Sequence, residues 1–496
     1  MVNRALPPAA FVILFFTALA SGAQTPPASA ELTAAAARED FDLMRQALEE
    51  AHSGLYRYST KAEIDRAFDA GRARLRGPLS KREFLVVLCE TLTPIRCGHT
   101  GVRPDDETGQ AMKEARTLPL RVLPEGSRLK VLLNDTPDDQ TIRPGMEVLE
   151  INGVKAADVV GRCLRLESGD GDIETGKRAH LGNGLARYYW AAIDPTARFT
   201  IRARDAAGKD ITATLDGVTE AERKENHNPV NEAVNAGIAK VRWTHENLSL
   251  RFLKDPDIAH ARVGYFVGDD FPRWVEETFN TLHEKGTRTL ILDLRGNGGG
   301  QDMYGAMLVS YLTDKPFRYF DRIHVKTITP AFKAASDWNG DDEHMTNLRE
   351  GMKPDPAGGL LVTEKGHAGV AEQRPGKFPF MGKVFVLIDG GTFSTAADFC
   401  AVAHHLKRAT FIGEETGGGY YGNNSGLGAM VTLPNSKFQV RVPMSEYWNA
   451  VPGYEGKRRG TLPDYAVQTT TAGVLTGEDE QLNRALKLAE NGPAAP

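Results

Sequence analysis

Ser394 stands between a predicted buried strand and a predicted helix, a place where a hydroxyl can do chemistry. The apolar run at 384–388 indicates a fully buried strand, Asp389-Gly-Gly-Thr breaks it, and apolar residues at helical spacing follow the serine. Unpaired amides and the helix dipole at such a terminus favour negative charge. The hydroxyl therefore either caps the helix or acts as a nucleophile beside a preformed oxyanion site.

Glycine-rich turns and one histidine motif recur in a fixed order along the chain. They read Cys97-Gly-His-Thr-Gly, Arg295-Gly-Asn-Gly-Gly-Gly after the buried run 289–294, Gly413-Glu-Glu-Thr-Gly, and Leu462-Pro-Asp. Glycines let a backbone approach a ligand closely. A dinucleotide fingerprint would need glycine where Gln301 stands, and the chain has no Gly-x-Ser-x-Gly and no His-Glu-x-x-His motif.

Taken in this order, the motifs resemble those of the C-terminal-processing and tricorn-type serine peptidases, most clearly over about 245–470. The resemblance implies a crotonase-like peptidase core with a PDZ-like insert. No lysine occurs between Lys407 and Lys437, so the Ser–Lys dyad of one branch is absent and the histidine-using branch fits better. The site residues that the resemblance implies are Ser394 as nucleophile, His99 as general base, Glu455 (with Glu446 in reserve) as the acid behind the imidazole, and Gly296, Gly298 and Thr395 as the oxyanion site.

These residue types fit acyl transfer. A serine hydroxyl becomes a good nucleophile only when a base within hydrogen-bond reach takes its proton. Histidine, with an ordinary pKa near ~6.5, can take that proton and later give it to the leaving amine. A carboxylate that orients the imidazole would complete a triad.

The pattern of elements predicts a multidomain α/β protein. Helical spacing and two capping boxes, at Thr60 and Ser80, indicate an N-terminal helical module over 37–103. Alternating strands with an Ile-Asn-Gly signature predict a PDZ-like β module over 117–217, for which a generic small β module is the alternative. A linker (218–243), a mainly parallel α/β peptidase core (244–470) and a C-terminal helix and tail (471–496) follow. The stretch 328–380 is expected to be a long loop over the site or disordered.

The N-terminus predicts export. A basic residue, an apolar run at 9–20 and small residues before position 24 form a secretory signal peptide over 1–23, followed by a flexible leader over 24–36. We therefore expect a secreted, periplasmic protein without a stable membrane span. The four cysteines match no zinc pattern; Cys89 and Cys97 could pair, or all four could be buried thiols.

The function predicted from these features is that of a serine endopeptidase that cleaves extended or unfolded polypeptides, possibly recognised at their C-terminus. No metal or nucleotide cofactor is implied, and the net charge of −5 argues against nucleic acid as a partner. Two alternatives remain open. One is a catalytically weakened, peptide-binding protein on the same scaffold, and the other is an esterase that uses the same serine.

Overall fold

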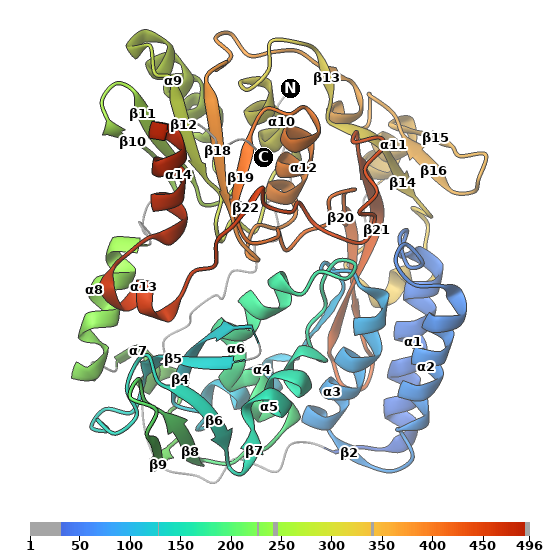
Figure 1. Cartoon of the computed structure of the whole chain (residues 1–496). Helices are drawn as coiled ribbons and strands as arrows, with labels where there is room; N and C mark the ends of the chain where they lie inside the picture. The colour runs from blue at the N-terminus through green and yellow to red at the C-terminus, as the bar shows by residue number, and fades with distance from the viewer. Residues whose placement is uncertain (1–30, 127, 226–227, 242–246, 339–341, 492–496) are drawn as a thin grey trace.

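The computed structural model of this chain describes residues 31–126, 128–225, 228–241, 247–338 and 342–491 (Figure 1). The predicted signal peptide and most of the predicted leader lie outside the described residues. Within those ranges, none of the helices combines the length and the apolar character needed to cross a membrane. The predicted class, a multidomain α/β protein, is confirmed.

A six-stranded sheet forms the centre of the C-terminal half. Its strands follow the order β10-β11-β12-β18-β19-β22, and all neighbours are parallel except β10 and β11. Parallel strands buried on both faces read as continuous apolar runs, which explains the runs at 289–294 and 384–388. The strands are β10 (Leu248–Lys254), β11 (Ile258–Val263), β12 (Thr289–Asp293), β18 (Lys383–Ile388), β19 (Thr410–Gly413) and β22 (Tyr465–Ala466).

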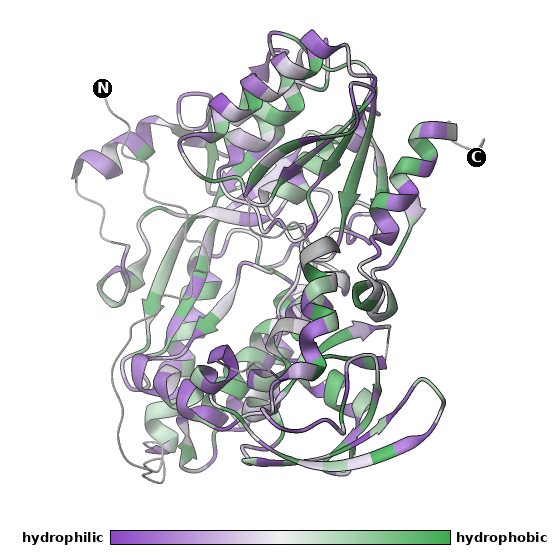
Figure 2. Ribbon diagram, turned by 90° about the vertical axis from the view of Figure 1, so that its left-hand side faces the viewer, coloured by the Kyte–Doolittle hydropathy of each residue, from purple (hydrophilic) through white to green (hydrophobic). Residues whose placement is uncertain are grey.

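Alternate side chains of this sheet feed two hydrophobic layers. On one face, Leu290, Leu292 and Val386 pack against α9 (Phe271–Lys285), α10 (Asp302–Ser310) and α12 (Thr395–His405). On the other face, Ile291 and Phe385 pack against α14 (Glu480–Asn491). The helix next to the C-terminus is banded in both hydropathy colours in Figure 2, as expected for a helix with one buried face.

A second, antiparallel sheet carries the N-terminal helical module. Its strands follow the order β15-β16-β14-β21-β20, and β3 (Gly101–Arg103) adds to β21. Figure 1 shows the blue helices beside β20 and β21. The helices are α1 (Ala34–Ala51), α2 (Lys61–Ala73) and α3 (Lys81–Leu92), and the strands are β14 (Phe320–Val325), β15 (Met352–Pro354), β16 (Leu360–Val362), β20 (Asn424–Thr432) and β21 (Gln439–Asn449).

The helical module buries its apolar stripes against this sheet. Phe41, Phe68 and Phe84 are fully buried in one cluster with Val440 and Val442 of β21. Both predicted capping boxes are present, at Thr60 with Glu63 and at Ser80 with Glu83. Residues from the two ends of the chain therefore share a hydrophobic core.

A third sheet forms a separate β module. Its antiparallel strands follow the order β4-β5-β6-β8-β9 with β7 on β6, and α5 and α6 cover its core. The stretch 165–195 of this module is largely the 18-residue helix α6. The elements are β4 (Leu120–Glu125), β5 (Arg128–Asn134), β6 (Glu147–Ile151), β7 (Val154–Lys155), α5 (Ala156–Leu164), α6 (Thr175–Ala192), β8 (Arg198–Arg204) and β9 (Asp210–Asp216).

Two sequence expectations about irregular segments are wrong. The predicted linker contains α7 (Glu220–Glu225) and α8 (Glu232–Val241), and Val234 of α8 packs on Val474 of α13 (Thr471–Thr476). The stretch 328–380 contributes α11 (Asp342–Glu350), β15 and β16, and the two strands extend the second sheet. Short amphipathic elements with little periodicity of their own gain their stability from such packing.

All four cysteines are free thiols, so no Cys89–Cys97 disulfide is present. Burial raises the pKa of Cys97 to about 11, which suits a packed thiol better than a nucleophile.

The remaining elements are short. They are β1 (Glu31–Leu32), β2 (Leu79–Ser80), α4 (Asp106–Glu114), β13 (Phe317–Arg318) and β17 (Glu372–Gln373).

Candidate active site

Three loops of the candidate site leave the parallel sheet at one edge. The glycine turn 294–300 follows β12, the turn 389–394 follows β18, and the glycine-rich loop 414–422 follows β19. Because the carboxyl ends of neighbouring parallel strands meet at the same edge, ligand sites of open α/β sheets form there. The topology thus brings the turn 294–300 beside two loops that come much later in the sequence.

Ser394 precedes the first turn of α12 in a conformation that ordinary residues avoid. Its φ is 54° and its ψ is −130°, and its side chain makes no capping hydrogen bond. The helix-capping role that the sequence also allowed for this hydroxyl is therefore wrong. A strained backbone persists where the surrounding structure enforces it, often at functional sites. Here it leaves the hydroxyl free to meet another group.

That group is the imidazole of His99, from the end of the helical module. His99 Nε2 lies 3.2 Å from Ser394 Oγ. The ring stacks on Phe393, with 4.6 Å between centroids. Burial, with a smaller contribution from the positive charge of Arg441, lowers the pKa of His99 to about 3. The imidazole is therefore neutral at physiological pH and can accept the proton of the serine hydroxyl.

The β3 strand holds the histidine turn in place. Its residues pair with β21, Gly101 opposite Arg441 and Arg103 opposite Gln439. Just before the strand, Thr100 Oγ1 lies 2.9 Å from Nε2 of the buried His52. A side chain added at Gly98 would lie 2.7 Å from the Phe393 ring, so the stacking requires a glycine there.

Two of the three predicted oxyanion donors are free to act. The amides of Gly298 and Thr395 donate no hydrogen bond within the described part of the chain. Gly299 lies directly against the nucleophile: a Cβ built on it would be 2.7 Å from Ser394 Cβ and 3.0 Å from the Thr395 nitrogen. Its φ of +101° also suits only glycine. The run of glycines thus lets the turn close on the serine.

The prediction for Gly296 is wrong. Its amide donates to Asp389 Oδ1 at 2.8 Å and is therefore not free for an oxyanion. The same carboxylate oxygen accepts from Gly391 at 2.9 Å. Asp389 thereby ties the glycine turn to the turn that precedes Ser394. The sequence offered a signal for this, since Asp389-Gly-Gly directly follows the buried strand.

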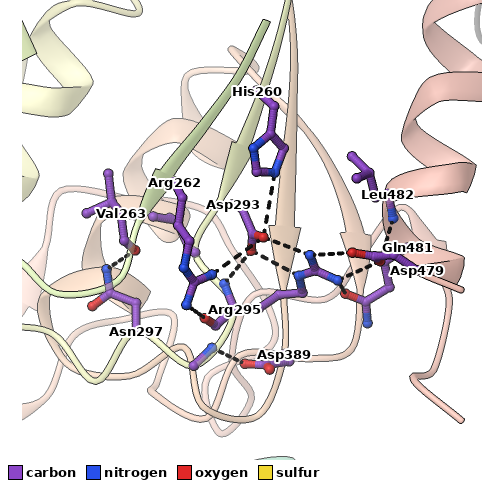
Figure 3. A network of polar contacts seen from close by, with 12 residues as sticks. His260, Arg262, Val263, Asp293, Arg295, Asn297, Asp389, Asp479, Gln481 and Leu482 are labelled. Atoms are coloured by element: carbon purple, nitrogen blue, oxygen red, sulfur yellow. Dashed lines mark hydrogen bonds and ion pairs between the residues drawn. The ribbon is translucent and has the colours of Figure 1, made fainter. Parts of the chain in front are cut away.

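A buried ionic network supports the glycine turn from behind (Figure 3). Arg295, the first residue of the motif, makes two hydrogen bonds to Asp479, at 2.8 and 2.9 Å, and pairs with Asp293 at 2.7 Å. Arg262 approaches Asp293 from β11 at 3.5 Å. The Arg295 guanidinium holds the pKa of Asp293 well below its usual value against the opposing effect of burial. The network joins β11, β12 and the residue just before α14.

Glu455, the predicted acid behind the imidazole, is not in contact with His99. Its side chain is exposed, and Nδ1 of His99 is buried without a hydrogen-bond partner among the described residues. The reserve candidate, Glu446, faces Arg57 instead, at 3.7 Å. The assignment of Glu455 is therefore wrong for this conformation, because the sequence could not place the loop 450–460 relative to a histidine in another module.

The site contains one buried carboxylate that sequence reasoning missed. Asp170, in the loop between α5 and α6, accepts hydrogen bonds from the amides of Gly98 at 2.8 Å and Gly419 at 3.3 Å. It lies in a stretch that reads only as a polar turn in the sequence. No motif pointed to it, since its partners come from two distant segments.

Comparison with known families agrees with this geometry. Residues 258–467 match the family model described as Peptidase family S41, and this region holds the glycine turn, Ser394 and the glycine-rich loop. The region 258–467 is therefore a peptidase domain of this family, and the chain is a serine-type peptidase. No curated protein matches the sequence closely enough to count as a relative.

Solved structures share the fold at low sequence identity. The crystal structure of mature CPAF is 15% identical, covers 93% of this chain and 99% of its own, and superposes with a TM-score of 0.64. Mature CPAF complexed with lactacystin is 16% identical, covers 92% and 98%, and has a TM-score of 0.64. These likenesses extend over almost the whole chain, including the helical and β modules.

Proposed function

We propose that this peptidase is a secreted, periplasmic serine endopeptidase that cleaves extended or unfolded polypeptides with Ser394 and His99. The observation that carries the proposal is the 3.2 Å approach of His99 Nε2 to Ser394 Oγ, together with the amides of Gly298 and Thr395, which donate no hydrogen bond within the described residues. A preformed oxyanion site and a positioned base are the two parts that acyl transfer needs. The proposal of export rests on the signal-like sequence of residues 1–23.

In the proposed reaction, His99 takes the proton of Ser394 as Oγ attacks the scissile carbonyl. The developing oxyanion is stabilised by the amides of Gly298 and Thr395, whose individual loss in such sites costs roughly 10²–10³ in kcat. The imidazolium then protonates the leaving amine, and water repeats the sequence on the acyl-enzyme. The negative oxyanion also stabilises the imidazolium, which offsets the low basicity of the buried ring.

We further propose that the module 117–217 is PDZ-like and binds the substrate's C-terminal residues. Such modules add an extended peptide as a further strand on a sheet edge. The observations in support are the Ile-Asn-Gly signature of the sequence and the five-stranded antiparallel sheet capped by α5 and α6. Among the described residues, β4 and β9 are the outermost strands of this sheet.

The test uses the purified chain and an unfolded protein substrate, with product ends identified by mass spectrometry. Ser394→Ala is expected to abolish cleavage and labelling by a fluorophosphonate, whereas Ser336→Ala, remote from the glycine turns, should retain both. Peptides with a free C-terminal carboxylate should have a lower KM than their amidated forms. Cleavage by Ser394→Ala, or hydrolysis of esters without any peptide-bond cleavage, would contradict the proposal.

A further inference from the structure

The imidazole of His99 is oriented by hydrogen bonds of the residues on either side of it and not by a hydrogen bond of its own Nδ1. Nδ1 of the imidazole has no hydrogen-bond partner in the part of the chain that the structure describes. On its C-terminal side, residue 99 is anchored by Thr100, through the His52 contact and the hydrogen bond from the Thr100 amide to the Cys97 carbonyl. On its N-terminal side, the Gly98 amide donates to Asp170. Asp170 therefore provides one of the two anchors that orient the imidazole.

The same carboxylate reaches the loop that covers the nucleophile. Asp170 Oδ2 accepts from the Gly419 amide, while a Cβ built on the adjacent Gly418 would be 3.1 Å from the Ser394 nitrogen. Asp170 is only 1% exposed. One buried carboxylate thus spans the turn that carries the base and the loop that lies against the serine.

Asp170 belongs to the β module, and its loop is docked by several backbone contacts. The Gly171 amide donates to the Arg96 carbonyl at 3.1 Å, and the Asp172 amide donates to the Arg458 carbonyl at 2.8 Å. At the start of α6, a Cβ on Gly176 would be 3.1 Å from Gly417 Cα. The loop therefore has a fixed seat between the helical module and the peptidase core.

Charge and burial indicate that Asp170 is more than a packing residue. Burial raises its pKa to about 6, and it interacts electrostatically with Arg57, Tyr58, Cys97 and Asp398. Above that pH it is an acceptor-only carboxylate in a buried position, which is costly unless hydrogen bonds compensate it. The two amide hydrogen bonds supply that compensation.

We propose that Asp170 is a positioning residue for the hydrolytic reaction, holding the Gly98–His99 peptide in register with the 417–419 loop so that the imidazole stays within reach of Ser394. The inference rests on the proposed function. Asp170 does not touch the reacting atoms, so its loss should lower kcat and leave KM nearly unchanged.

The test compares Asp170→Asn with Asp172→Asn at about pH 8. Asparagine keeps the shape of the side chain, but its amide group can satisfy only one of the two amide donors. We expect kcat to fall by about 10- to 100-fold, the size of effect that a misplaced catalytic group produces, with KM within about twofold and the thermal transition retained. Asp172 lies on the same loop and pairs with the exposed Arg96 and Arg458, so its variant should stay within about twofold of the wild type.

The outcomes separate this inference from the proposed function. If the wild-type chain neither hydrolyses peptides nor reacts with a fluorophosphonate, the proposed function and this inference fail together. If the wild type is active and Asp170→Asn keeps the wild-type kcat, with or without a higher KM, the inference alone is overturned. An equal loss in Asp172→Asn would overturn it too. Should Asp170→Asn not fold, Asp170→Glu, which keeps the charge, provides the same kcat and KM comparison.

Discussion

The imidazole of His99 lies 3.2 Å from the hydroxyl of Ser394, although 295 positions separate the two residues. The histidine lies in the turn before β3 of the antiparallel sheet, and the serine lies in the turn after β18 of the parallel sheet. The base and the nucleophile are therefore positioned independently, each by its own sheet. Loops from the parallel sheet and from the β module complete the site between them.

Replacing His99 with alanine should remove the base and leave the oxyanion site intact. We expect kcat to fall by at least about 10⁴-fold, because removal of one member of such a constellation leaves only residual catalysis. His404→Gln is the matched control, since His404 lies on α12 but bonds the Tyr420 hydroxyl at 2.7 Å rather than the serine. Rates on an unfolded protein substrate, with thermal melts of each variant, give the answer; comparable rates for the two variants would remove His99 from the mechanism.

The glycine turn should distinguish two neighbouring positions. Gly299→Ala places a methyl group 2.7 Å from Ser394 Cβ at a φ of +101°, so kcat should fall by at least about 100-fold. Gly298→Ala places its methyl group 3.5 Å from the Tyr265 ring, an ordinary contact, and keeps the amide. Its activity should stay within about threefold of the wild type. Steady-state kinetics of both variants test this. A larger loss of kcat in Gly298→Ala than in Gly299→Ala would contradict the described position of the turn.

Buried His52 should make the chain sensitive to acid. Burial lowers its pKa to about 3, while in the unfolded chain it titrates near ~6.5. Between these values the unfolded state takes up a proton that the folded state does not. The free energy of unfolding therefore falls as the pH decreases below about 6.5, by up to about 1.4 kcal/mol per pH unit for this residue.

His52→Asn removes that proton uptake. At about pH 8 the variant should be less stable than the wild type by about 1 kcal/mol, through the lost contact to Thr100. The deficit should narrow as the pH falls from about 6.5, because only the wild type is destabilised by protonation of this group. Urea titrations at several pH values measure it, and a deficit that stays constant or widens would show that His52 is not held neutral.

The network behind the glycine turn should be costly to open. Asp479→Ala leaves the largely buried guanidinium of Arg295 with fewer partners, and we expect the free energy of unfolding to drop by about 2–4 kcal/mol. The exposed pair between Arg288 and Asp257 is the control, and Arg288→Ala should cost less than about 1 kcal/mol. Urea unfolding compares the two. Equal costs would mean that the network of Figure 3 adds no stability of its own.

The parts of this fold that could be predicted from the sequence are those encoded locally. Apolar runs such as 384–388 identify buried parallel strands, and each capping box is contained within four residues. The glycine turn after β12 and Ser394 after β18 could be placed together because parallel neighbours end at one edge. His99 was found through a motif, not through any local preference.

The rest depends on contacts between distant segments. Asp170 accepts hydrogen bonds from two amides, one 72 and the other 249 positions away. The sequence around Asp170 gives no sign of either contact. The Gly296 amide was misassigned because its partner, Asp389, lies on another strand end. Glu455 is implied by the family resemblance alone, which says nothing about where an exposed loop points.

The pairing of β3 with β21 has a consequence for how the molecule comes into being. The strand that follows the histidine turn is held by residues 439–441, which come after Ser394 in the sequence. A polypeptide interrupted before that point would contain the serine and the glycine turn but would have no partner for β3. Hydrolysis by His99 and Ser394 thus depends on residues 439–441, although these residues contribute no reacting atom.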